Sequence, residues 1–145
     1  MIIPRQFIRP IQKVQQNFFI SANAMVQYAG IAALKEAAAD VAHMKAVYNK
    51  RRQYMIRRVK AMGLGITVEP TGAFYVFANV KHISQNSFKL AFDILEKAHV
   101  GVTPGIDFGL NGEGYIRLSY ANSMENIKAG MDRLENYFNQ KVRQK

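Results

Sequence analysis

One arginine lies at the centre of a segment whose sequence otherwise predicts a β-strand, "GEGYIRLSYA" at residues 112–121. Side chains alternate between the two faces of a strand, so the apolar positions 116, 118 and 120 should face a core. Arg117 then shares the opposite face with Tyr115 and Ser119. A guanidinium is a rigid planar fork that can hold a carboxylate through two parallel hydrogen bonds, and a strand keeps it in place. Arg117 is therefore a candidate binding residue for a small carboxylate. The alternatives are a surface position on an exposed sheet and an ion pair with a core carboxylate.

The other residue types that could do chemistry form no comparable pattern. The chain has no cysteine, which excludes disulfides, thiolate nucleophiles and cysteine-bound metals. Its three histidines, His43, His82 and His99, lack metal-ligand spacing, so the sequence predicts neither a metal site nor a catalytic residue. The glycine-rich segment at 104–114 lacks the spacing of a dinucleotide-binding loop and precedes a strand instead of a helix. We expect it to carry the backbone tightly from one strand to the next.

A strong positive charge is the main signal in the composition. The 145 residues include 20 Lys and Arg against 10 Asp and Glu, which gives a net charge of +10. Many of these cations fall in "KAVYNKRRQYMIRRVK" at residues 45–60. At about 100° per residue they spread around a helix everywhere outside its apolar stripe. This distribution favours a solvated helix face, and a nucleic-acid-binding patch is the alternative.

The order of the expected elements predicts an α/β fold with an α+β-like, two-layer arrangement. It contains a small mixed sheet of about four short strands packed with helices. The helices are expected at 22–39, 40–62, 86–100 and after 123, with Ser21, Asp40 and Ser123 as N-caps. The strands are expected at 65–70, 72–80, 100–104 and 112–121, and residues 1–20 form an irregular or short helical lead-in.

Three expectations concern burial. The strand at 72–80 is apolar on both faces, which predicts a central strand covered on each side. The helix at 22–39 is uncharged from 22 to 34 and apolar around most of its circumference, so we expect another subunit or domain to cover it. The later helices each carry an apolar stripe at three- and four-residue steps, namely Val41, Met44, Tyr48, Met55, Val59 and Met62, then Phe88, Phe92 and Leu95, and finally Ile127, Met131, Leu134 and Phe138.

Composition also predicts the compartment. No stretch approaches the ~20 consecutive apolar residues that a membrane-spanning helix needs. The absence of cysteine is typical of a protein in a reducing compartment. We therefore predict a cytoplasmic protein that does not bind membranes.

Three segments together resemble one enzyme family. The segment "VGVTPGIDFGLNGEGYIRLSYANSMENIKAGMDRL" at 100–134 resembles the C-terminal signature of the class I/II aminotransferases, the aspartate aminotransferase family of pyridoxal-phosphate enzymes. "EPTGAFYVFANV" at 69–80 is similar to their small-domain strand pair, and "VQQNFFISANAMVQYAGIAAL" at 14–34 to the segment where the chain leaves the large domain. The resemblance implies the small C-terminal domain of that fold at 40–145. It also implies a lead-in and apolar helix from the junction with the large domain and dimer at 1–39.

The resemblance also implies roles for individual residues. Arg117 corresponds to the arginine that binds the substrate α-carboxylate, and Ser21 lies near the neighbouring subunit's active site. The parent enzyme is a homodimer that uses pyridoxal phosphate to transfer an amino group between an amino acid and a 2-oxo acid. The Schiff-base lysine and the cofactor-holding groups of the family precede the residues present. The isolated chain should therefore be inactive and bind no cofactor. Without the large domain and the dimer mate, residues 22–34 should promote self-association.

The alternative function is a basic nucleic-acid-binding or structural interaction module without catalysis. A nucleic-acid module should bind a random DNA duplex at about 50 mM salt and lose affinity steeply by about 200 mM, because counterions are recaptured. We expect no binding at the lower concentration in a fluorescence-anisotropy titration. Tight, salt-sensitive binding would instead favour the nucleic-acid class.

Overall fold

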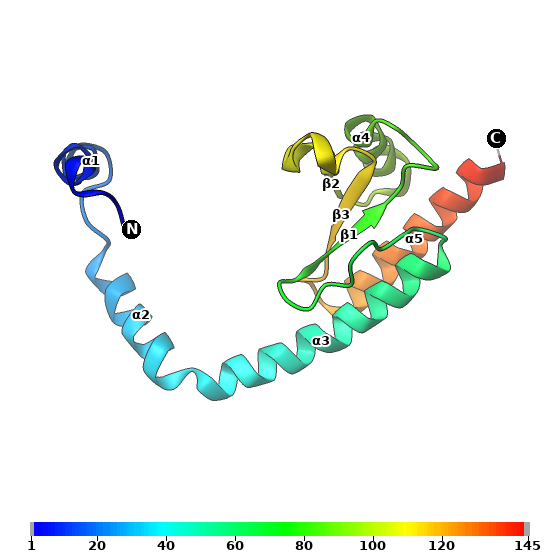
Figure 1. The fold of residues 1–145 in the computed structure, drawn as a ribbon. Helices are drawn as coiled ribbons and strands as arrows, with labels where there is room; N and C mark the ends of the chain where they lie inside the picture. The colour runs from blue at the N-terminus through cyan, green and yellow to red at the C-terminus, as the bar shows by residue number, and fades with distance from the viewer. Residues whose placement is uncertain (1, 144–145) are drawn as a thin grey trace. The chain divides into compact units, whose positions relative to one another are not determined.

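The computed structural model describes residues 2–143 and divides the chain into two units, Met1–His43 and Met44–Lys145. Figure 1 shows the helices and strands in chain order. The division falls inside helix α3 (Ala38–Ala61). The first unit is helical, and the second contains the sheet.

The chain begins with a regular helix, α1 (Arg5–Phe18), where the sequence predicted an irregular or short helical lead-in. Pro10 lies inside this 14-residue helix. Because proline has no backbone N–H, the helix loses one hydrogen bond there but continues for two more turns. No residue of α1 is buried.

The apolar helix expected at 22–39 is α2 (Ala24–Glu36), which ends before the last predicted residues. Asn23 caps it, since its Oδ1 accepts the Met25 N–H at 2.8 Å. The prediction of Ser21 as the cap is wrong. Ser21 lies two residues before Asn23, which is the position whose side chain can reach the first turn. No residue of α2 is buried, and Leu34 is 91% exposed. That another subunit or domain covers this helix stays a prediction.

The second unit has two layers, one small sheet and the helices on one of its faces. Strands β1 (Tyr75–Asn79), β2 (Thr103–Pro104) and β3 (Tyr115–Ser119) lie in the order β1-β3-β2. The helices are α3, α4 (Ser87–Ala98) and α5 (Met124–Arg143) (Figure 1). This confirms the predicted α/β class with its two-layer arrangement.

The sheet differs from the prediction in strand number and direction. It has three strands, and both strand pairs are antiparallel, where we expected about four strands in a mixed sheet. The segment 65–70 makes only an isolated bridge between Gly65 and Asn79. Helix α3 holds the C-terminal end of this segment. The Pro70 carbonyl accepts a hydrogen bond from Arg52 Nη1 at 3.1 Å, and Glu69 forms an ion pair with Lys60.

Strand β1 lies at the sheet edge, so the prediction of a central, doubly covered strand is wrong. Val76 and Ala78 are fully buried, but Tyr75 on the opposite face is 38% exposed. The central strand is β3, whose partners flank it on both sides. The apolar second face of β1 therefore does not belong to the core.

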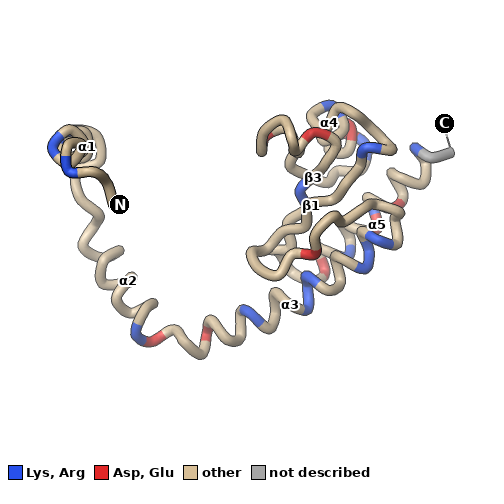
Figure 2. The backbone as a smooth tube through the Cα atoms, in the orientation of Figure 1, with Lys and Arg blue, Asp and Glu red and all other residues tan. Residues whose placement is uncertain are grey.

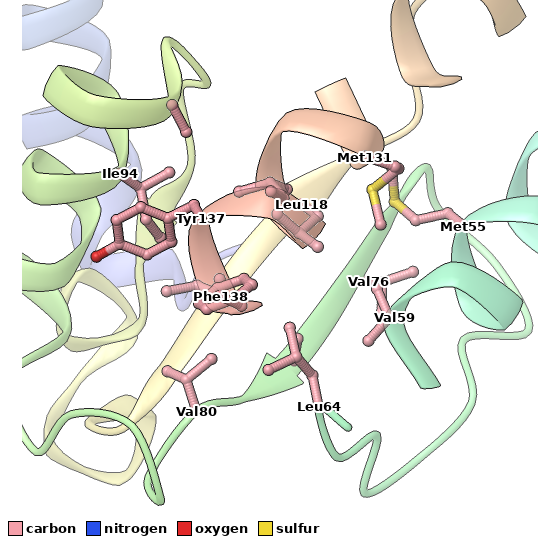
Figure 3. Packing of buried hydrophobic residues seen from close by; sticks show 14 of the residues in the cluster. Met55, Val59, Leu64, Val76, Val80, Ile94, Leu118, Met131, Tyr137 and Phe138 are labelled. Atoms are coloured by element: carbon pink, nitrogen blue, oxygen red, sulfur yellow. The ribbon is translucent and has the colours of Figure 1, made fainter. Parts of the chain in front are cut away.

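One hydrophobic core joins the sheet to the three helices (Figure 3). Alternating residues of β3 and its C-terminal end face this core, as the sequence predicted, because Ile116, Leu118 and Tyr120 are almost fully buried. The predicted stripe of α5 is buried too, at Ile127, Met131, Leu134 and Phe138. The stripe of α3 reaches the core from Tyr48 onward, since Tyr48 packs against the core and Met55 and Val59 are buried, while Val41 and Met44 are about half exposed.

The predicted core face of α4 is wrong. Phe88, Phe92 and Leu95 are about half exposed, and the buried residues of α4 are instead Ser87, Leu90, Ala91, Ile94 and Ala98. Both sets have helical spacing, so periodicity alone cannot choose between them. The set with alanines lets α4 pack closely against the sheet, which leaves the two phenylalanines outside.

Ion pairs connect the helices of the second unit. Arg58 of α3 pairs with Asp132 at 2.7 Å and Glu135 at 2.9 Å, both on α5. The blue positions along α3 in Figure 2 mark the basic run to which Arg58 belongs. Arg58 therefore serves packing within the chain, as do Arg52 and Lys60 at the 65–70 segment. This use of the cations counts against a nucleic-acid patch, and at Arg58, whose side chain is only 19% exposed, it also differs from the predicted solvated helix face.

A second charged cluster fastens α4 to α5. Asp93 of α4 accepts hydrogen bonds from Lys141 and Tyr137 of α5, and Lys97 pairs with it at 2.6 Å. The hydrogen bond from Lys141 has the largest effect on the pKa of Asp93. Together with those from Lys97 and Tyr137, it holds this pKa well below its ordinary value. The carboxylate is therefore ionised wherever the protein is folded near neutral pH.

The corrected burial of α4 can be tested with two substitutions on the same helix. Ile94→Ala should lower the free energy of unfolding by about 2–5 kcal/mol, because it leaves a cavity in the core. Phe92→Ala, although it removes more atoms, should cost less than about 1 kcal/mol, because that residue is 56% exposed. Urea denaturation followed by circular dichroism measures both. A larger loss of stability in Phe92→Ala than in Ile94→Ala would contradict the burial described for α4.

Candidate functional site

Arg117 lies in the middle of the central strand, on the sheet face away from the core. Its register partners are Phe77 of β1 on one side and Thr103 of β2 on the other. Its sequence neighbours, Ile116 and Leu118, are buried in the core. The burial pattern thus confirms the two faces that the sequence predicted for this strand.

The half-buried Arg117 side chain contacts residues from three other segments. Nη2 donates a hydrogen bond to Thr103 Oγ1 at 3.2 Å. The central carbon of the guanidinium lies 5.2 Å from the ring centre of Tyr75 and 4.9 Å from that of Phe108, both within cation–π distance. None of the ion pairs formed by residues 2–143 includes Arg117. The described residues therefore do not support the alternative of an internal ion pair.

Aromatic rings continue along the same face. Phe77 stacks on Tyr115 with ring centres 4.9 Å apart and planes 1° from parallel, and it meets Phe108 edge-on at 5.8 Å. These rings replace water beside the guanidinium with apolar surface. This face remains open to solvent among the described residues, since Phe108 is 51% exposed and Tyr75 38% exposed.

A tight double turn brings Phe108 to Arg117. It consists of two short 3-10 helices, η1 (Gly105–Phe108) and η2 (Leu110–Gly112). A Cβ on Gly105 would lie 1.9 Å from the Gly112 carbonyl oxygen, so the two backbone segments can approach only because both residues are glycine. The glycine-rich segment is therefore the tight path between strands that the sequence predicted.

A carboxylate ties this double turn to the start of α4. Glu113 Oε1 accepts the backbone N–H of Ser87 at 2.6 Å and that of Gly114 at 2.9 Å. The buried Ser87 hydroxyl in turn accepts the Ile106 N–H at 3.2 Å. The hydrogen bond from Ser87, followed by that from Gly114, lowers the pKa of Glu113 below its ordinary value.

The remaining predicted site residue, Ser21, lies in the first unit, in the exposed loop before α2. Its proposed place near a neighbouring subunit stays a prediction. The sequence did not identify Thr103, Tyr75 or Phe108 as partners of Arg117. The predicted strand at 100–104 was a signal for Thr103, but its register against β3 was not visible in the sequence.

Within residues 2–143, no three His, Asp or Glu side chains are arranged so that they could hold a metal ion. No described helix combines the length and the apolarity needed to cross a membrane.

Comparison with known proteins identifies the family. The family model described as "Aminotransferase class I and II" matches residues 2–134. The chain belongs to this family. The match confirms the resemblance that the three sequence segments indicated.

Individual relatives of the family match over most of the chain. An aspartate aminotransferase of Pyrococcus horikoshii is 43% identical over 138 residues, which cover 93% of this chain and 35% of that protein. A (5-formylfuran-3-yl)methyl phosphate transaminase of Methanocaldococcus jannaschii is 41% identical over 135 residues, which cover 92% of this chain and 35% of the relative. The crystal structure of an aromatic aminotransferase from Pyrococcus horikoshii superposes with a TM-score of 0.86 at 35% identity, covering 96% of this chain and 38% of that one. The chain therefore spans about a third of the length of the relatives it matches.

The family implies pyridoxal phosphate in its complete enzymes, and the described residues do not by themselves fit that cofactor. A Schiff-base lysine must give up its proton, which an apolar setting away from carboxylates favours. Every lysine within residues 2–143 is exposed except Lys141, which is half-buried and paired with Asp93. The described residues therefore combine the candidate Arg117 with no lysine suited to hold the cofactor.

Because the folded pKa of Glu113 is depressed, its carboxylate stabilises the fold most above its ordinary pKa of about 4.3. This contribution is lost as the pH falls through the folded value. Glu113→Gln should therefore lower the free energy of unfolding at pH 7, and the gap from the wild type should narrow as the pH falls from about 5 to about 3. Urea denaturation across this pH range measures the gap. Glu96→Gln, at an exposed position of α4, controls for the loss of one negative charge. A gap that stays constant with pH would contradict the role given to this carboxylate.

Proposed function

We propose that this chain is the substrate-carboxylate-binding part of a pyridoxal-phosphate-dependent aminotransferase. The complete enzyme transfers an amino group between an amino acid and a 2-oxo acid. The observation that carries the proposal is Arg117, a guanidinium on the open face of the central strand with no carboxylate partner among residues 2–143. Family membership supports the reaction class.

In this proposal Arg117 binds the α-carboxylate that every amino acid and 2-oxo acid carries. A bidentate pair fixes the direction of the carboxylate as well as its distance, so it orients the rest of the substrate. The lysine and the cofactor pocket belong to the other two thirds of the enzyme. The 145-residue chain alone is then inactive and binds no cofactor.

The first unit has a supporting role in the proposal. Residues 1–39 form the junction with the large domain and the dimer mate, which cover the exposed α2. Ser21 then lies near the neighbouring subunit's active site in a homodimer. Without these covers, the apolar side chains of α2 should favour self-association. A cytoplasmic location is part of the same proposal.

Arg117→Lys, made in a complete aminotransferase that contains this chain, tests the carboxylate assignment. The substitution keeps the charge but replaces the planar fork by a point charge. We expect KM for the amino donor to rise roughly 10- to 100-fold, the value of one strong charge-assisted interaction. Steady-state kinetics measure it, with Arg57→Lys on the exposed surface of α3 as the matched control. An unchanged KM in the Arg117 variant would remove the assignment.

A further inference from the structure

The contacts of Arg117 restrict its guanidinium before any ligand arrives. An arginine side chain on an open surface samples many rotamers, and ordering it on binding reduces affinity. Here Tyr75 and Phe108 lie within 5.2 Å and 4.9 Å of the guanidinium carbon. Both rings are held in turn, Tyr75 by strand β1 and Phe108 by the tight turn η1 and its edge contact with Phe77.

The hydrogen bond to Thr103 determines which edge of the Arg117 guanidinium remains open to a ligand. A guanidinium has two edges that can grip a carboxylate with two parallel hydrogen bonds, and each edge uses one of the two Nη2 hydrogens. Thr103 Oγ1 accepts one hydrogen of Nη2, so it occupies one edge and leaves the other whole. Thr103 is placed to do this because its register partner in the sheet is Arg117 itself.

We propose that Thr103, Tyr75 and Phe108 are positioning residues that hold the Arg117 guanidinium with one bidentate edge presented to the substrate carboxylate. This inference rests on the proposed function for the identity of the ligand. The preorganisation itself is a property of the chain that can be measured without any ligand.

Nuclear magnetic resonance of the 145-residue chain measures this preorganisation through the Arg117 Nε–Hε signal, which Arg117→Lys identifies by its loss. Thr103→Val keeps the shape of the side chain but removes the hydroxyl. We expect faster Hε exchange with water and a lower order parameter in this variant, and recovery in Thr103→Ser, which keeps the hydroxyl. Thr67→Val is the matched control, because the Thr67 hydroxyl approaches Tyr115 at 3.4 Å and not Arg117. Phe108→Leu is a second variant that loosens the guanidinium without touching the hydrogen bond.

Titration with pyruvate then tests the consequence for binding, with pyruvamide as the neutral control. We expect Thr103→Val to weaken pyruvate binding roughly 2- to 10-fold, the range of one ordinary hydrogen bond, and Thr103→Ser to restore it. An Nε–Hε signal equally ordered in the wild type, Thr103→Val and Phe108→Leu would overturn the positioning role and leave the proposed function standing. Pyruvate binding that is unaffected by Arg117→Lys would instead count against the carboxylate assignment. Circular dichroism spectra confirm that each variant is folded.

Discussion

The antiparallel register of β3 between β1 and β2 is the constraint on which the candidate site depends. It sets Phe77 and Thr103 on either side of Arg117 and sends the neighbours of Arg117 into the core. A shift of one residue would exchange the two faces and bury a guanidinium, which is costly without a partner. The hydrophobic core therefore keeps Arg117 on the outer face as firmly as it keeps Ile116 and Leu118 inside.

The double turn before β3 adds the part of the site that the strands cannot supply. Two glycines allow its backbone segments to approach within a distance that no side chain permits, and the Glu113 carboxylate fastens it to the start of α4. Phe108 reaches the guanidinium from this turn. The chain thus places a cation, aromatic rings and a hydroxyl on one sheet face, with all three helices on the other. In the proposed function, this is the surface that meets the substrate carboxylate.

The charge and the apolar surface of the chain have different explanations. Arg52, Arg58 and Lys60 of the basic run hold parts of the second unit together. The exposed apolar residues of α2 have no such internal role, since none of that helix is buried. Family membership and the one-third span offer an account of this, because the relatives contain a large portion that this chain does not match.

Several features were predictable from the sequence because they depend on local pattern. Strand alternation identified the faces of β3, helical periodicity identified the buried stripe of α5, and three segments in order indicated the family. The core face of α4 and the edge position of β1 were not predictable, because two apolar faces satisfy the same periodicity and only packing against other elements selects one. The partners of Arg117 were likewise not predictable from the sequence. Tyr75, Thr103 and Phe108 precede Arg117 by 42, 14 and 9 positions in the sequence. The sequence by itself determined that a guanidinium stands on a strand. Tertiary structure alone decided what surrounds it, because strand register and loop path are set by contacts between segments distant in the chain.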